Sequence, residues 1–129
     1  MHPTAIKLHK KSGILELKYA DDKIAELNAE YLRVFSPSAE VQGHHPSQAV
    51  LQYGKRWVKI QNILPVGNYA IQIEFDDGHN SGIYSWELLW NLFENREQRW
   101  QDYLDRLSKA GKHRDPEQQT LQIFDPKNN

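Results

Sequence analysis

Large apolar residues at every second position from 69 to 75 constrain the fold more than any other feature of this 129-residue chain. Because neighbouring side chains of a strand point to opposite faces, a period of two predicts a half-buried strand. Turn-forming residues flank this strand at Pro65–Asn68 and at Asp76–Asn80, and residues 82–84 suit a returning strand. The apolar positions of the alternation are Tyr69, Ile71, Ile73 and Phe75.

The N-terminal third has the same periodicity around a glycine turn. Apolar residues alternate from Ile6 to Leu8 and again from Leu15 to Tyr19, with Lys10–Gly13 between them, which predicts a hairpin. Asp21–Asp22 is a candidate cap for a short helix over residues 23–33.

The middle of the chain combines a predicted loop with a predicted strand. Residues 36–50 contain two prolines and Gly43, which predicts a loop. Val58 and Ile60 then alternate with polar residues and open the next strand.

A long helix is predicted from Ser85, its N-cap, to Gly111, where a glycine is a natural stop. Two acid–base pairs four residues apart, Asp102 with Arg106 and Asp105 with Lys109, are expected to support it. Its apolar stripe consists of Trp86, Leu89, Trp90, Phe93, Trp100, Tyr103, Leu104 and Leu107.

These elements predict an α+β domain. Its sheet is mostly antiparallel, its long C-terminal helix packs on one face, and a short helix precedes the central loop. We expect one domain over residues 1–111 and a polar tail over 112–129, in which only Leu121, Ile123 and Phe124 are candidates for docking.

Composition excludes several classes of function. The formal net charge of −1 gives no overall attraction to nucleic acid or to an anionic membrane. Without cysteine the chain has no disulfide, thiolate nucleophile or thiolate metal ligand. No apolar run approaches the roughly 20 residues of a spanning helix, and we expect a cytoplasmic protein with no nucleic-acid or membrane partner.

Three segments resemble, in the same order, the N-terminal domain family of gamma-butyrobetaine hydroxylase. The segments are Tyr31–Ser38, Val58–Gly67 and Asp77–Leu89. The resemblance covers about residues 5 to 93. It implies a domain that precedes a separate iron- and 2-oxoglutarate-dependent catalytic domain in carnitine-pathway hydroxylases. The family's domain is also appended to P-loop ATPases that carry iron–sulfur clusters, and it forms small stand-alone bacterial proteins.

In the hydroxylases the resemblance implies a structural zinc ion held by three cysteines and one histidine. His79 matches the histidine, whereas Ser36, Ser38 and Val41 occupy the cysteine positions. A hydroxyl group is a poor zinc ligand and valine is none. We therefore expect no cofactor unless other residues replace the missing thiolates around zinc or iron.

His79, His44 and His45 are the candidate metal ligands. Imidazole suits zinc, nickel, copper and iron, and the two adjacent histidines lie close after the cysteine positions. The competing interpretation is a turn histidine whose ring bonds nearby backbone or Ser81. The side chains of adjacent histidines diverge, which disfavours their joint use.

Catalytic patterns are sparse. Asp76 and Asp77 are explained by turn formation, and His113–Asp115 begins an iron triad that has no later histidine. The Gly54–Lys59 segment mixes basic and aromatic residues, which we interpret as an exposed turn leading into a strand with a half-buried tryptophan. Neither a phosphate loop nor a nucleophile elbow is present. We therefore predict that the chain is not an enzyme.

The distal half of the long helix carries more apolar area than one small sheet needs. Trp100, Tyr103 and Leu107 are predicted to contact a protein partner or a second copy of the chain. The preferred hypothesis is a non-catalytic binding or adaptor module, linked by the resemblance to iron–sulfur or cofactor metabolism. The alternatives are a metal-binding domain centred on His79 and a small enzyme with an unrecognised pocket.

Overall fold

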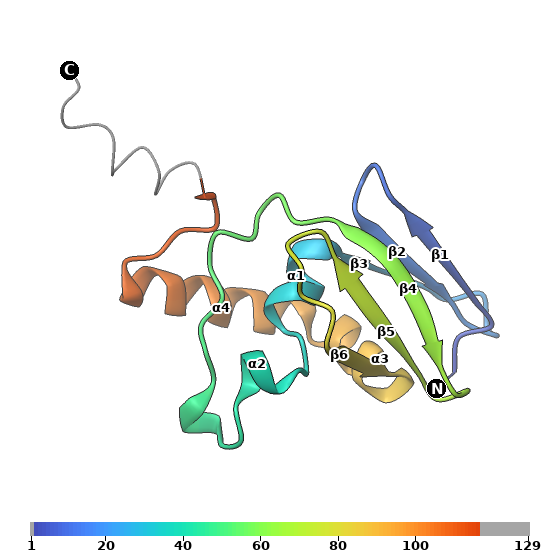
Figure 1. The fold of residues 1–129 in the computed structure, drawn as a ribbon. Coiled ribbons are helices and arrows are strands. Elements are labelled where there is room, and N and C mark those ends of the chain that lie inside the picture. Colours follow the sequence, from blue (N-terminus) through green and yellow to red (C-terminus); the bar gives the residue numbers. More distant parts are fainter. Residues whose placement is uncertain (1, 117–129) are drawn as a thin grey trace.

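The computed structural model describes residues 2–116, in which six strands form two antiparallel three-stranded sheets (Figure 1). The strand order is β1-β2-β3 in the first sheet and β4-β5-β6 in the second. The strands are β1 Ala5–His9, β2 Ile14–Lys18, β3 Ile24–Asn28, β4 Ile60–Val66, β5 Ala70–Phe75 and β6 Gly82–Ser85. The helices are α1 Ala29–Val34, α2 Ala39–Gln42, η1 Pro46–Gln48, α3 Trp86–Glu94 and α4 Arg96–Ala110.

The predicted alternation is confirmed in β2 and in β5 from Ile71 to Phe75, whereas Tyr69 is 56% exposed, Ala70 is buried and Ile6 of β1 is 38% exposed. β1 and β2 form the expected hairpin, and Leu15 and Leu17 of β2 have no exposed area. In β5, Ile71, Ile73 and Phe75 are buried. Neighbouring strands pair antiparallel throughout, and the predicted α+β class is correct.

The helix predicted over residues 23–33 is wrong in its first half, which is strand β3. Asp22, with φ of 64°, turns the chain so that β3 pairs antiparallel with β2. Ala25 and Leu27 are buried and alternate with exposed neighbours, so the period is two there. Helix α1 starts only after Asn28, whose side chain accepts the Tyr31 N–H at 2.8 Å.

The predicted long helix is two helices. Asn95 leaves helical geometry with φ of −107° and ψ of 20°, and it separates α3 from α4. Asparagine favours such breaks because its amide competes with the backbone for hydrogen bonds, and Asn95 Nδ2 donates to the Asn91 carbonyl. Gly111 ends α4 in the left-handed region, as predicted.

Two further boundaries differ from the prediction. The 36–50 segment is not only loop, because it contains α2, capped by the Ser38 side chain, and the short η1. Strand β4 continues through Pro65, where the sequence predicts a turn. A proline is tolerated there because β4 is an edge strand of its sheet, where a missing N–H costs no pairing.

The core lies between the two sheets and the helices. Leu89 and Leu92 of α3 pack in one cluster with buried residues of both sheets. Figure 1 shows α3 and α4 on the same side of the sheets, with α1 between α4 and the strands. Val34 of α1 forms a second small cluster with Tyr103 and Leu107 of α4.

Packing continues beyond the boundary predicted at residue 111. The Gly54 and Arg56 N–H groups donate to the carbonyls of His113 and Arg114 at 2.8 and 3.0 Å. The Arg114 guanidinium donates two hydrogen bonds to buried Glu30, at 2.9 and 2.7 Å. The predicted docking of Leu121, Ile123 and Phe124 lies outside the described residues. No helix in the described part of the chain is long and apolar enough to cross a membrane.

Asn28 provides a test of where α1 begins. Asn28→Ala removes the side-chain cap of α1, and we expect a loss of about 1 kcal/mol in the free energy of unfolding. Urea denaturation measures the change, and Asn28→Asp, which keeps an acceptor, is the matched control. If residues 23–33 were one helix, alanine inside it would instead stabilise the protein.

Candidate functional site

The loop after α1 and the turn after β5 meet through three polar side chains. Ser36 Oγ lies 2.8 Å from His79 Nε2, and His79 Nδ1 lies 3.1 Å from Glu40 Oε1. A carboxylate only accepts, so we assign the ring hydrogen to Nδ1, and Nε2 then accepts from the serine hydroxyl. We call this arrangement the Ser36–His79–Glu40 bridge.

The bridge is shielded from water on its serine and histidine side. Ser36 is 0% exposed and His79 is 6% exposed. Burial lowers the pKa of His79, and the nearby Arg33 charge lowers it further, against the opposing influence of Glu40. The imidazole is therefore neutral near neutral pH. Beside the bridge, Ser38 Oγ and Ser81 Oγ are hydrogen-bonded at 2.6 Å, so the same two segments meet twice.

The bridge has the connectivity of a Ser–His–acid triad but lacks the access that a nucleophile needs. A Cβ atom placed on Gly82 would lie 2.6 Å from Ser36 Oγ, which shows how closely β6 covers the hydroxyl. The Ser38 N–H also donates to this oxygen at 3.2 Å. No space for a substrate carbonyl remains beside Ser36 in this conformation.

The predicted metal ligands are not brought together. His44 and His45 are exposed, and both ring nitrogens of His79 are engaged by side chains. Within residues 2–116, no three His, Asp or Glu side chains form a group that fits a metal ion. The structural zinc implied by the resemblance does not fit these residues, because Ser36, Ser38 and Val41 supply no thiolate.

Asp77 joins the same turn to α1 and to the segment before β4. Its carboxylate accepts from Arg33 Nε at 2.9 Å and from Lys55 Nζ at 2.7 Å. Burial raises the pKa of Asp77, but the Lys55 and His79 N–H hydrogen bonds and the Arg33 charge outweigh it and hold the pKa below its usual value. The N–H of His79 donates to Asp77 Oδ1, which confirms the turn role predicted for this carboxylate.

The other sequence candidates are distributed over the surface. The Gly54–Lys59 segment is the predicted turn, although Trp57 is 57% exposed and more open than predicted, with the Arg56 guanidinium 5.0 Å from its ring centre. The His113–Asp115 segment is held by backbone bonds and by the Arg114–Glu30 ion pair. Asp76 accepts the Lys59 N–H, so it bonds to the segment before β4 and not to an amide of its own turn.

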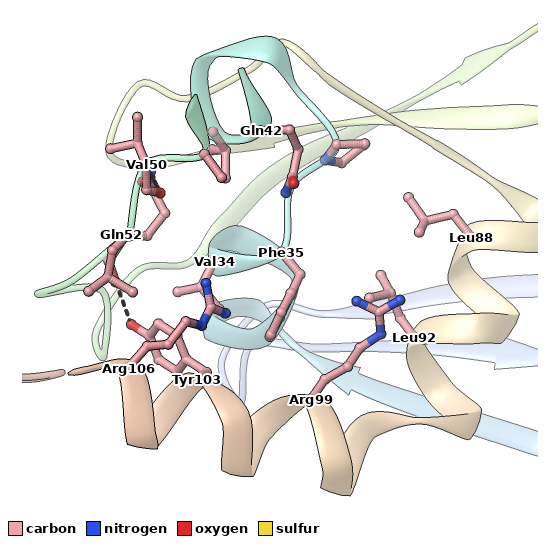
Figure 2. Close-up of a pocket in the computed structure, with 14 residues that line it drawn as sticks. Val34, Phe35, Gln42, Val50, Gln52, Leu88, Leu92, Arg99, Tyr103 and Arg106 are labelled. Atoms are coloured by element: carbon pink, nitrogen blue, oxygen red, sulfur yellow. Dashed lines mark hydrogen bonds between the residues drawn. The ribbon is translucent and has the colours of Figure 1, made fainter. Parts of the chain in front are cut away.

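A pocket of about 360 Å³ opens where α4 faces the 34–37 and 49–52 segments (Figure 2). Pro37, Val41 and Gln42, which belong to the same loop as Ser36, line one side of it. Nine of its fourteen lining residues are apolar, but polar atoms make up about half of the surface that they expose. The lining residues other than these three are Val34, Phe35, Ala49, Val50, Leu51, Gln52, Leu88, Leu92, Arg99, Tyr103 and Arg106.

Arg99 and Arg106 bring two positive charges to this apolar wall. Their guanidinium carbons lie 5.6 and 5.9 Å from the ring centre of Phe35. No ion pair joins either of them to a carboxylate of the described residues. The predicted pairing of Asp102 with Arg106 does not form. Asp102 and Asp105 instead accept from Gln98 and Gln101.

The predicted partner-binding residues mostly face inward. Tyr103 is 1% exposed, and its hydroxyl donates to the Gln52 carbonyl at 2.7 Å. Leu107 is 4% exposed, whereas Trp100 is half-buried beneath the Arg114 guanidinium. The sequence places more apolar area on this part of the helix than one small sheet needs. That area is covered by α1, by the segment around Gln52 and by the residues after α4. Tyr103 and Leu107 are thus covered by the chain itself.

Sequence reasoning missed Glu40 and the two pocket arginines. The seven-residue spacing of Arg99 and Arg106 places them on one helix face, which was an available signal. Glu40 gave no signal, because only the folded loop brings its carboxylate to His79.

The fold and the buried bridge define an α+β domain of two antiparallel sheets whose helical side carries a pocket. The sequence profile of the family described as gamma-butyrobetaine hydroxylase-like, N-terminal, matches residues 6–90. The chain belongs to this family.

Three similar solved structures share the fold of this chain. Two NMR solution structures share 52% and 45% identity with the chain, with TM-scores of 0.77 and 0.76. Each match covers 89% of this chain, and 90% and 86% of the other chain. A crystal structure from Acidithiobacillus ferrooxidans, of a DUF971 family protein of unknown function, is 34% identical with a TM-score of 0.55 and covers 70% of this chain and 91% of its own. No functionally curated protein matches.

The lowered pKa of His79 predicts a specific loss of stability in acid. The unfolded chain binds a proton on this ring near the ordinary histidine pKa of about 6.5, and the folded chain binds it only at lower pH. The contribution of the neutral His79 ring to the free energy of unfolding is complete above about pH 6.5. It decreases as the pH falls toward the pKa of His79 in the folded chain. Urea unfolding between about pH 7.5 and pH 5 should show a weaker pH dependence in His79→Gln than in the wild type.

His44→Gln, which alters an exposed histidine, is the matched control for that measurement. It should keep the wild-type dependence on pH. An equal slope in wild type and His79→Gln would contradict the assignment of a buried neutral ring.

Zinc is expected to leave the wild-type protein unchanged. Equimolar zinc should not raise its melting temperature, because both His79 nitrogens are engaged and no thiolate is near. The variant Ser36→Cys/Ser38→Cys/Val41→Cys supplies the donors of the family site, and its melting temperature should rise with zinc. A zinc-dependent rise in the melting temperature of the wild type would show that a metal ion displaces the hydrogen bonds of the bridge.

Proposed function

We propose that the protein is a non-catalytic binding module. Its pocket beside α4 holds a part of a protein partner that combines an apolar side chain with a carboxylate. The observation that carries this proposal is the pair of guanidinium groups on an apolar wall without a carboxylate partner. Arginine is the side chain best suited to bind a carboxylate through paired hydrogen bonds.

Arg99 supports the proposal most directly. Its terminal Nη2 donates to Asn91 Oδ1 at 2.6 Å, but its Nε is buried and has no acceptor among the described residues. A buried donor without a partner costs about 1–3 kcal/mol, and because this Nε is closed to solvent, a bound carboxylate reaches Arg99 only through its terminal nitrogens.

The polar groups around the pocket favour binding over chemistry. Guanidinium groups stay protonated and do not act as bases. Burial raises the pKa of the Tyr103 hydroxyl well above its ordinary value, and its proton is donated to a carbonyl. The side-chain amides of Gln42 and Gln52 are engaged with backbone carbonyls. The lining therefore contains no general base and no activated nucleophile.

The proposal is tested with hexanoate, which combines an apolar chain with one carboxylate. In two-dimensional amide NMR spectra, hexanoate should shift resonances of the 34–37 and 49–52 segments and of α4 around Arg99–Arg106. Hexylamine, with the same chain and the opposite charge, should not produce these shifts.

Arg106→Gln should weaken hexanoate binding about two- to fivefold, since Arg106 is exposed and a charge-assisted contact there is worth roughly 0.5–1 kcal/mol. Lys109→Gln removes the same charge from the same helix outside the pocket and should bind like the wild type. Equal shifts with hexanoate and hexylamine, or an equal loss in the two variants, would refute the proposal.

A further inference from the structure

The two pocket arginines stand on either side of one aromatic ring. In Figure 2 the guanidinium groups of Arg99 and Arg106 flank Phe35. Because their carbons lie 5.6 and 5.9 Å from its centre, they are no farther apart than these two distances together. Seven residues of helix advance about 10.5 Å along the axis, which agrees with two separate anion positions.

The pocket around these positions is lined by apolar side chains and by the side chains of Gln42 and Gln52. Phe35, Val50 and Leu51 face it from the two loop segments, and Leu88 and Leu92 from α3. A volume of about 360 Å³ accepts a large side chain or two, but not a helix, which is about 10–12 Å across with its side chains. The arrangement therefore favours an extended segment that inserts side chains from one face.

An extended chain presents alternate residues to the same side at about 3.3 Å per residue. Residues i and i+4 are then about 13 Å apart along the backbone, and their side chains incline inward to reach the two guanidinium groups. Residue i+2 falls between them, opposite Phe35. The formal net charge of this protein is −1, so the attraction is local to the arginine pair.

From this geometry, and resting on the proposed function, we infer that the partner contributes an extended segment with acidic residues at positions i and i+4 and a large apolar residue at i+2. One carboxylate pairs with the terminal nitrogens of Arg99, and the other pairs with Arg106. The central apolar side chain enters the pocket over Phe35.

The test uses the wild-type protein and blocked pentapeptides, so that no variant needs to fold. The probe is Glu-Ala-Leu-Ala-Glu. Its isomer Glu-Glu-Leu-Ala-Ala has the same composition and charge but the wrong spacing. We expect the probe to bind about tenfold more tightly than the isomer by NMR titration, since the second acid of the isomer cannot reach its arginine. Replacing both glutamates by glutamine should weaken binding further.

A mutant cycle assigns each contact. In Arg106→Gln, one of the two single Glu→Gln peptides should bind as well as the parent peptide, because its lost partner is already absent. In Lys109→Gln, both single replacements should weaken binding as they do in the wild type.

The outcomes separate the two proposals. If hexanoate binds at the pocket but the probe and its isomer bind equally, the spacing inference is refuted and the binding module stands. If neither hexanoate nor any of the peptides shifts the pocket amides, both proposals are refuted.

Discussion

The hydrogen bond between Ser36 Oγ and His79 Nε2 is the contact on which the helical side of this domain depends. It ties the loop after α1 to the turn between β5 and β6, and that loop supplies Pro37, Val41 and Gln42 to the pocket wall. Removing either member leaves a buried polar atom without a partner, which costs about 1–3 kcal/mol. The bridge therefore helps to fix this pocket wall, in which Pro37 follows Ser36 directly and the Gln42 amide donates to the Ser36 carbonyl.

Helix α1 has only six residues, yet its side chains link the region of the bridge to other parts of the domain. All six are buried, and its polar groups reach three different regions. Tyr31 donates to the Leu92 carbonyl of α3, and Glu30 receives Arg114 from beyond α4. Arg33 reaches the turn at Asp77. A helix too short to be stable alone is held by these tertiary contacts and in turn positions Phe35 between the two pocket arginines.

Local periodicity sufficed to predict most of the fold. The alternation through Leu15 and Ile73 gave correct strands, because burial on one face imposes a period of two. It failed at residues 24–28, where a five-residue strand runs directly into a helix and the two periods overlap in one short window. The break at Asn95 was missed because the apolar stripe continues across it. The site was harder to predict from the sequence, because the Glu40–His79 contact joins residues 39 positions apart and leaves no local pattern.

The cysteine-free bridge also changes how this domain responds to its surroundings. A thiolate cluster must be kept reduced, because peroxide converts cysteine to sulfenic and higher acids. Hydroxyl, imidazole and carboxylate groups do not undergo that chemistry under the same conditions. The join between loop and turn in this member of the family therefore contains no group that peroxide converts to a sulfenic acid.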